Sequence, residues 1–168
     1  MVKCNGGRLL RNLSMTPWQL RRAFAPSLLD AIRAEIAASE RLHGGQLRFA
    51  VEGALPMAAL LRGQSPRERA LEVFSLLRVW DTEHNNGVLI YLLLAERDVE
   101  IVADRGIDGR VTAREWQDIC HQMEVAFHAG RYETGALEGV RALTRLLVLH
   151  FPTGAAGGTQ LPDSPVLL

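Results

Sequence analysis

The stretch from Trp80 to Gly87 gathers two acids, a histidine and two side-chain amides directly before the apolar run Val88–Leu94. The apolar run predicts a buried strand, so these polar groups stand where a rigid strand end meets solvent. Side chains of these types can bind a ligand, and His84 could act as a general base. Residue types alone do not name a reaction.

Capping signals and hydrophobic periodicity predict the elements that position this stretch. Three capping boxes, each a Ser or Thr followed three residues later by Glu or Gln, predict helix starts at Thr16, Ser65 and Thr112. The segment from Gly87 to Ala95 is apolar on both faces, which is typical of a central strand covered by helices. Helices are expected at about residues 16–24, 26–43, 55–63, 65–80, 112–130 and 132–151, and strands at 47–51, 87–95 and 99–103.

This order of elements predicts an α/β fold: a three-layer α/β/α sandwich, with a small mixed sheet flanked by helices on both faces. A right-handed crossover through the Ser65 helix makes the first two long strands parallel, and the third returns antiparallel. The topology therefore places residues 43–46, 81–86 and 104–108 at one end of the sheet.

The composition limits location and partners. Nineteen basic and nineteen acidic residues cancel, which argues against nucleic acid and anionic lipid as partners. No apolar run approaches the ~20 residues of a membrane span, and the first residues lack a signal peptide's apolar stretch. We therefore expect a cytoplasmic monomer without a membrane span, a disulfide framework or a zinc site. We expect a flexible arm over residues 1–14, one domain over 15–151 and a disordered tail over 152–168.

Several of these segments carry a family resemblance. Asn85–Ile90, with Arg97, Val99–Ile101 and Asp104–Ile107, resembles the TPM domain. This family is named for plant thylakoid, photosystem II assembly and animal receptor-regulating proteins. The similarity continues through Phe127–Tyr132 and covers roughly residues 26–151.

The resemblance implies an α/β/α sandwich and, in some relatives, a calcium site and acid phosphatase activity. This chain departs from the family pattern at the first strand. Gln46 stands where relatives often have a glutamate, so one anionic ligand is replaced by a neutral amide. Many relatives also carry a signal peptide and a membrane anchor, neither of which is expected here.

Two interpretations of the polar cluster stay open. Calcium takes roughly six to eight oxygen ligands. Adjoining loops could supply them from Asp81, Asn85, Asn86, Asp104 and Asp108. The same residues also suit a purely structural role, because Asn-Gly is a turn signal and a loop aspartate can cap nearby amides.

The same cluster supports two classes of function. A non-catalytic binding or accessory module would dock a protein partner and take a divalent cation, such as Ca²⁺, at the Asn-Asn-Gly end. The alternative is a metal-dependent acid phosphatase acting on phosphomonoesters, with Arg105 binding the anion. No nucleophile with a partnered base is evident in the sequence, which favours the binding module.

Overall fold

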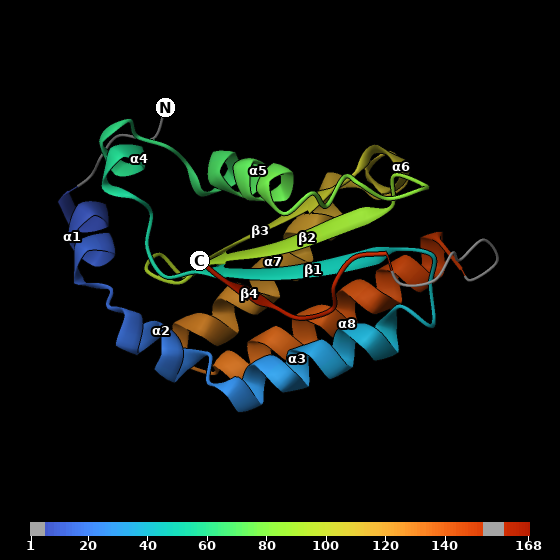
Figure 1. The fold of residues 1–168 in the computed structure, drawn as a ribbon, viewed down its shortest axis with the longest axis horizontal. Coiled ribbons are helices and arrows are strands. Elements are labelled where there is room, and N and C mark those ends of the chain that lie inside the picture. Colours follow the sequence, from blue (N-terminus) through green and yellow to red (C-terminus); the bar gives the residue numbers. More distant parts are fainter. Residues whose placement is uncertain (1–5, 153–159) are drawn as a thin grey trace.

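The computed structural model describes residues 6–152 and 160–168. The elements follow one another along the chain as shown in Figure 1. Their bounds are α1 Gly6–Ser14, α2 Pro17–Ala23, α3 Pro26–Ser39, β1 Gln46–Glu52, α4 Met57–Leu61, α5 Pro66–Leu76, β2 Gly87–Leu93, β3 Asp98–Ala103, α6 Arg105–Asp108, α7 Ala113–His128, α8 Tyr132–His150 and β4 Val166–Leu167.

The four strands form one mixed sheet in the order β3-β2-β1-β4. β1 and β2 run parallel with Gln46 opposite Gly87, and β3 returns antiparallel to β2 with Ala103 opposite Val88. The predicted parallel pairing and the predicted antiparallel return strand are therefore confirmed. β4 adds a short parallel pairing along the other side of β1.

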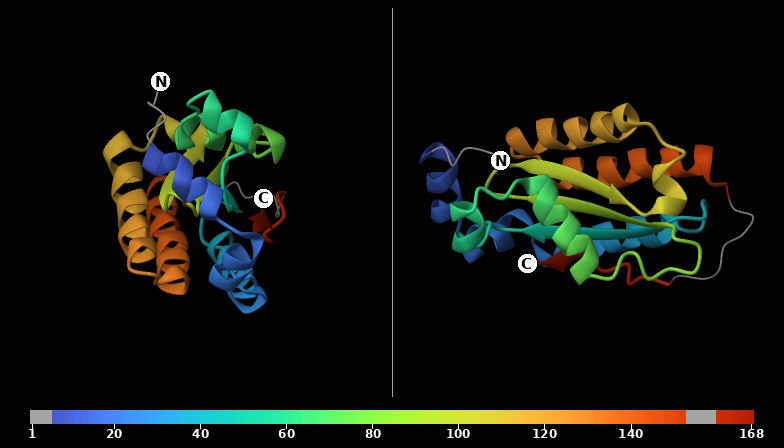
Figure 2. Two further views of the ribbon diagram at one scale, coloured as in Figure 1. Left: turned by 90° about the vertical axis from the view of Figure 1, so that its left-hand side faces the viewer. Right: turned by 90° about the horizontal axis from the view of Figure 1, so that it is seen from above.

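Helices cover both faces of the sheet, which confirms the predicted three-layer α/β/α sandwich (Figure 2). Because side chains alternate along a strand, β1 sends Phe49 and Val51 into the larger core with α2, α3, α7 and α8. Tyr91 and Leu93 of β2 face the smaller core under α4 and α5. Both central strands are buried along their whole length. The apolar sequence of β2 requires this, whereas β1 also buries the polar side chains of Gln46, Arg48 and Glu52.

Three of the helices begin where the sequence predicts, at complete capping boxes. The side chain of the capping residue accepts the backbone N–H three residues on, while the Glu or Gln there reaches back to the capping residue's own N–H. Both halves of this box are present at Thr16, Ser65 and Thr112. None of the helices among the described residues is long and apolar enough to cross a membrane.

The expectation of a flexible arm is wrong for residues 6–14, which form α1. Arg8 and Asn12 are buried there, and both donate to the carboxylate of Glu96, Arg8 at 2.8 and 3.0 Å and Asn12 at 2.9 Å. Asn12 Oδ1 also accepts the N–H of Leu55 at 2.9 Å. These long-range polar contacts anchor α1 to the rest of the domain.

The expectation of a disordered tail is wrong for residues 160–168. This C-terminal segment lies along β1, where Val166 and Leu167 pair with Ala50 and Val51. The expected domain bounds remain a prediction, and residues 1–5 and 153–159 lie outside the described residues.

Candidate functional site

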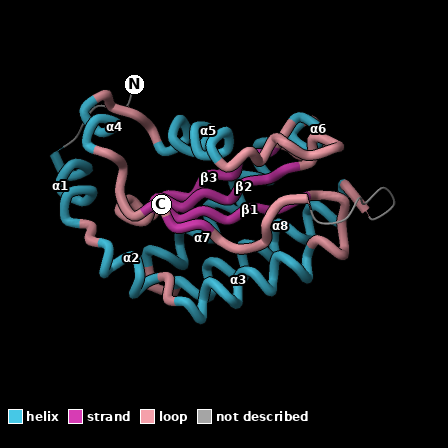
Figure 3. Tube along the Cα trace, viewed as in Figure 1, coloured by secondary structure: helices cyan, strands magenta, loops and turns pink. Residues whose placement is uncertain are grey.

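The three loops that the sequence places together meet at one end of the sheet, beside α6 (Figure 3). Backbone bonds join them: Gln46 N donates to Asn86 O at 2.9 Å, and Asp104 N donates to Gly87 O at 2.8 Å. Gly106 N donates to Asn85 O at 2.9 Å. We call the segments 43–46, 81–87 and 104–108 the loop end of the sheet.

Two glycines allow the backbones at the loop end to approach this closely. A Cβ on Gly87 would lie 1.9 Å from Val79 O, and one on Gly106 would lie 2.4 Å from Asn85 O and 2.6 Å from His84 O. Real Cβ atoms do not approach backbone oxygens so closely, so each position excludes a side chain. The glycines of Asn85-Asn86-Gly87 and Asp104-Arg105-Gly106 are therefore packing requirements of this end.

Gly106→Ala is expected to lower the free energy of unfolding by about 1–3 kcal/mol, because the backbones of His84 and Asn85 must move to admit the methyl group. Gly109→Ala is the matched control, since a Cβ there meets nothing within 4 Å. Chemical denaturation of both variants checks the prediction. Equal midpoints for the two variants would show that the loops do not pack as described.

The side chains of the loop end mostly bind one another. Asn85 adopts a positive φ of 52°, and its Oδ1 accepts two bonds from the Arg105 guanidinium, at 3.2 and 3.1 Å. Asp104 caps α6 by accepting Arg105 N at 2.7 Å. Asn86 Nδ2 donates to Gly44 O at 2.5 Å, which joins the loop before β2 to the loop before β1.

Two buried oxygens at the loop end have no hydrogen-bond partner within the described residues: Asn86 Oδ1 and Asp104 Oδ2. Buried acceptors without partners are costly, so they are natural ligands for a cation. Among the described residues, no three His, Cys, Asp or Glu side chains lie close enough to hold a metal. A cation here would therefore depend on amide, carbonyl and water oxygens besides the carboxylates.

The other predicted ligands lie less favourably. Asp81 is exposed, and its side chain makes no hydrogen bond within the described part of the chain. Asp108 is also exposed and lines a separate cavity of about 470 Å³ with Arg67 and Glu100. Asn85 is already bonded to Arg105, so it can bind a cation only after the guanidinium leaves.

His43, whose role no pattern in the sequence indicates, is buried at this same end with 1 % of its surface exposed. Its Nδ1 accepts the N–H of Gly45 at 3.1 Å, and its Nε2 lies 2.7 Å from Ser39 Oγ. Ser39 Oγ in turn lies 2.7 Å from Thr144 Oγ1, which donates to Val140 O at 2.7 Å. This chain of bonds, which ties the loop to α3 and α8, requires the neutral ring with its proton on Nε2.

Burial lowers the pKa of His43 to about 4, from an ordinary value near 6.5. The unfolded chain therefore takes up a proton before the folded protein does as the pH falls. The stability from the neutral ring is complete above about pH 6.5 and is lost as the pH falls towards 4, a loss on the order of 3 kcal/mol.

Unfolding by urea between pH 7 and pH 4 measures this loss. His43→Gln removes the titrating ring, so its stability is expected to fall less steeply over that range than that of the unaltered protein. Parallel curves for the two proteins would exclude His43 as the source of the acid sensitivity.

With this geometry described, comparison with known proteins identifies the family. The family model of the TPM domain matches residues 21–146, which span strands β1 to β3, α3 and the helices α4 to α7, with most of α8. The chain belongs to the TPM domain family. No curated protein matches the sequence.

Two solved structures share the TPM fold of this chain. BA42 from the psychrophilic bacterium Bizionia argentinensis superposes with a TM-score of 0.73 at 24% identity, covering 84% of this chain and 93% of that one. The N-terminal domain of a protein from P. gingivalis has a TM-score of 0.58 at 22% identity, covering 78% of this chain and 82% of that one. At these identities the likeness concerns the fold alone.

Proposed function

We propose that this TPM domain is a non-catalytic binding module that takes a divalent cation at the loop end of its sheet. The pair of partnerless buried oxygens, Asn86 Oδ1 and Asp104 Oδ2, is the observation that carries the proposal. A cation bound between the loops would satisfy both oxygens and neutralise the Asp104 carboxylate. It would thereby fix the surface that these loops present to a protein partner.

The remaining ligands would come from the exposed Asp81 carboxylate and from water. Calcium suits such a mixed set, because it accepts carboxylate, amide, carbonyl and water oxygens in flexible geometry. Asn85 contributes differently, since its bond to Arg105 holds a positive charge beside the site. That nearby charge weakens cation binding, so a modest affinity is expected.

The arrangement favours binding over phosphomonoester hydrolysis. Arg105, the expected anion-binding residue, directs its guanidinium to Asn85. The side chain of His84 is exposed and makes no hydrogen bond within the described residues. A hydrolase needs an activated nucleophile, which in turn needs a partnered base or a metal-bound water held against the substrate.

Calcium titration followed by amide NMR tests the cation site. Shifts are expected for residues 43–46, 81–87 and 104–106, with no turnover of p-nitrophenyl phosphate. Asp104→Asn keeps a residue that caps helices equally well but removes the charge, so it should weaken calcium binding at least about tenfold.

Asp108→Asn is the matched control, because that carboxylate lines the separate cavity. It should leave calcium affinity nearly unchanged. An equal loss of calcium affinity in the two variants, or no amide shifts at the loop end on adding calcium, would contradict the proposed site. Calcium-dependent turnover that Asp81→Ala abolishes would instead establish the phosphatase.

A further inference from the structure

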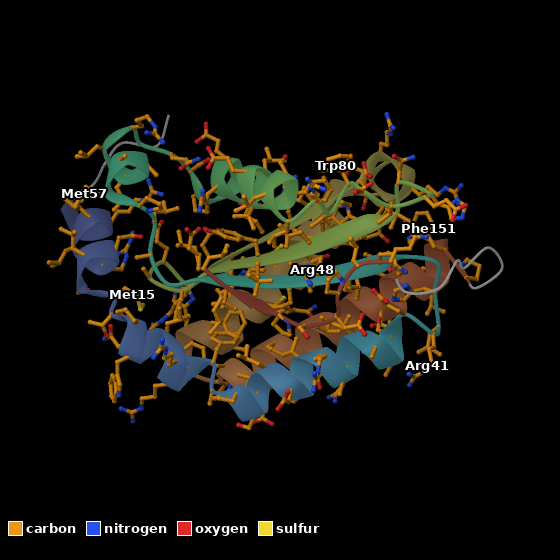
Figure 4. The ribbon with its side chains drawn as sticks, in the orientation of Figure 1. Met15, Arg41, Arg48, Met57, Trp80 and Phe151 are labelled. Atoms are coloured by element: carbon orange, nitrogen blue, oxygen red, sulfur yellow. The ribbon has the colours of Figure 1, made fainter. Side chains whose placement is uncertain are left out.

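The opposite end of the sheet holds a larger cavity, of about 920 Å³. It opens where β2 ends and the turn to β3 begins, and α1, α2 and the link between α7 and α8 form its other walls. Figure 4 labels Met15, which lies between α1 and α2 on this side of the molecule. Its volume falls within the usual range for small-molecule sites, and none of the predicted metal ligands lines it.

Three arginines from three separate elements line this cavity: Arg11 of α1, Arg22 of α2 and Arg97 of the β2–β3 turn. None of the three guanidiniums forms a salt bridge within the described residues. The carboxylate in the wall, Glu96, is already held by Arg8 at 2.8 Å. The cavity therefore carries a surplus of positive charge that its own walls do not neutralise.

Arg97 adopts a backbone conformation that is unfavourable for an arginine. Its φ is 54°, in the left-handed region where a glycine or an asparagine costs less. A costly conformation at the wall of a cavity points to a role for the side chain. Among the residues that the structure describes, the guanidinium makes one long bond, from Nη1 to His128 O at 3.5 Å, which leaves most of its donors available.

Aromatic side chains lie beside these charges. Trp18 is 65 % exposed, and the guanidinium of Arg22 lies 5.2 Å from its ring centroid. Tyr132 stacks on the buried Phe127 with centroids 6.0 Å apart, so its position in the wall is fixed. An exposed indole next to the Arg22 guanidinium offers one surface for a flat ring and another for an anion.

We propose that this cavity binds a small organic dianion that carries a flat ring. Guanidiniums bind phosphate and carboxylate oxygens in pairs, and three of them match a double negative charge better than a single one. The wall is formed before binding, because Arg8 and Asn12 anchor α1 through Glu96. The site is separate from the proposed cation site at the loop end.

Adenosine 5′-monophosphate and 2,6-naphthalenedicarboxylate are suitable probes. The first carries its double charge on a phosphate and the second on two carboxylates. Adenosine lacks the charge, and inorganic phosphate lacks the ring. Amide NMR titration should show shifts at Trp18, Arg97 and Gly130 with at least one dianion, and roughly tenfold weaker binding of adenosine and of phosphate. Binding of one probe alone would identify phosphate or carboxylate as the group that the site prefers.

Arg97→Gly is the decisive variant, because glycine adopts a positive φ without strain. It should leave the midpoint of unfolding unchanged or raised, and it should weaken binding of the dianion roughly tenfold or more. Arg78→Gly is the matched control: Arg78 also has a positive φ, of 51°, but lies outside the cavity. Trp18→Leu should weaken binding of the ring-bearing dianions and leave binding of inorganic phosphate unchanged.

Three outcomes would overturn the proposal. The dianions could bind no more tightly than adenosine, which would remove the role of charge. Arg97→Gly and Arg78→Gly could weaken binding equally, which would make the effect one of net charge. Shifts could gather at the loop end and not around the cavity, which would place the anion elsewhere.

Discussion

Arg69→Ala is expected to lower the free energy of unfolding by about 3–5 kcal/mol, because it leaves a buried carboxylate without its counter-charge. Glu52 at the end of β1 is 4 % exposed and accepts two bonds from Arg69, at 2.9 and 2.8 Å. Tyr91 of β2 donates to the same carboxylate at 2.6 Å. Burial and the charge of Glu52 raise the pKa of Tyr91, so the phenol stays protonated and cannot replace the guanidinium.

Chemical denaturation at neutral pH measures the loss. Arg33→Ala is the control, since Arg33 pairs with Asp30 where both side chains are more than half exposed, and such pairs contribute at most about 1 kcal/mol. The double variant Glu52→Leu with Arg69→Met should recover much of the stability, because it removes both charges together. Similar losses for Arg69→Ala and Arg33→Ala would show that Glu52 is not buried as described.

The sequence predicted the elements whose signals are local. The capping boxes at Thr16, Ser65 and Thr112 each depend on residues three positions apart, and all three formed as expected. The parallel pairing of β1 with β2 followed from the handedness of a crossover, which is nearly invariant. The meeting of three loops at one end is a consequence of that topology.

The elements that the sequence missed depend on partners far along the chain. α1 is anchored by Arg8 and Asn12 on Glu96, across 88 and 84 residues respectively, and no pattern within residues 6–14 announces that contact. β4 is only two residues long and depends on an open strand edge. A short helix such as α6 has too few residues to show a period.

The sequence predicted where the candidate site lies but not how its side chains are oriented. Loop topology brought Asn85, Asn86 and Asp104 together, whereas the orientation of each side chain was decided by competing hydrogen bonds. Arg105 took Asn85 Oδ1, and Asp108 lies in the wall of another cavity. His43 is a clear omission: its glycine neighbours predicted the end of a helix, and only the fold shows that the ring is buried.

The C-terminal segment, residues 160–168, supplies the second large effect expected here. Its backbone carbonyls at Pro162 and Ser164 accept bonds from the buried guanidinium of Arg48, the latter at 3.2 Å (Figure 4). Gln46 Oε1 accepts the N–H groups of Gln160 and Leu161, at 2.7 and 3.2 Å. This segment therefore covers the free edge of β1 and pairs the side chains of Gln46 and Arg48.

Ending the chain at Thr159 is expected to lower the free energy of unfolding by about 3–6 kcal/mol, as two bonds to a charged group are each worth roughly 1.5–3. The deletion also uncovers Leu161's site in the smaller core and the unpaired edge of β1. An open edge recruits other strands, so the truncated protein should associate as its concentration rises. Denaturation and size-exclusion chromatography measure the two effects.

A peptide of residues 160–168 separates loss of this contact from general damage. Added to the truncated protein, it should restore the unfolding midpoint and suppress association, because the edge of β1 and Arg48 offer it the same partners. Arg48 donates to backbone carbonyls of this segment and also lies near the charge of Asp163, so a peptide with Asp163→Asn should still rescue, but less completely than the original sequence. Failure of both peptides to rescue would mean that β1 does not hold this segment, and the sheet would then end at β1.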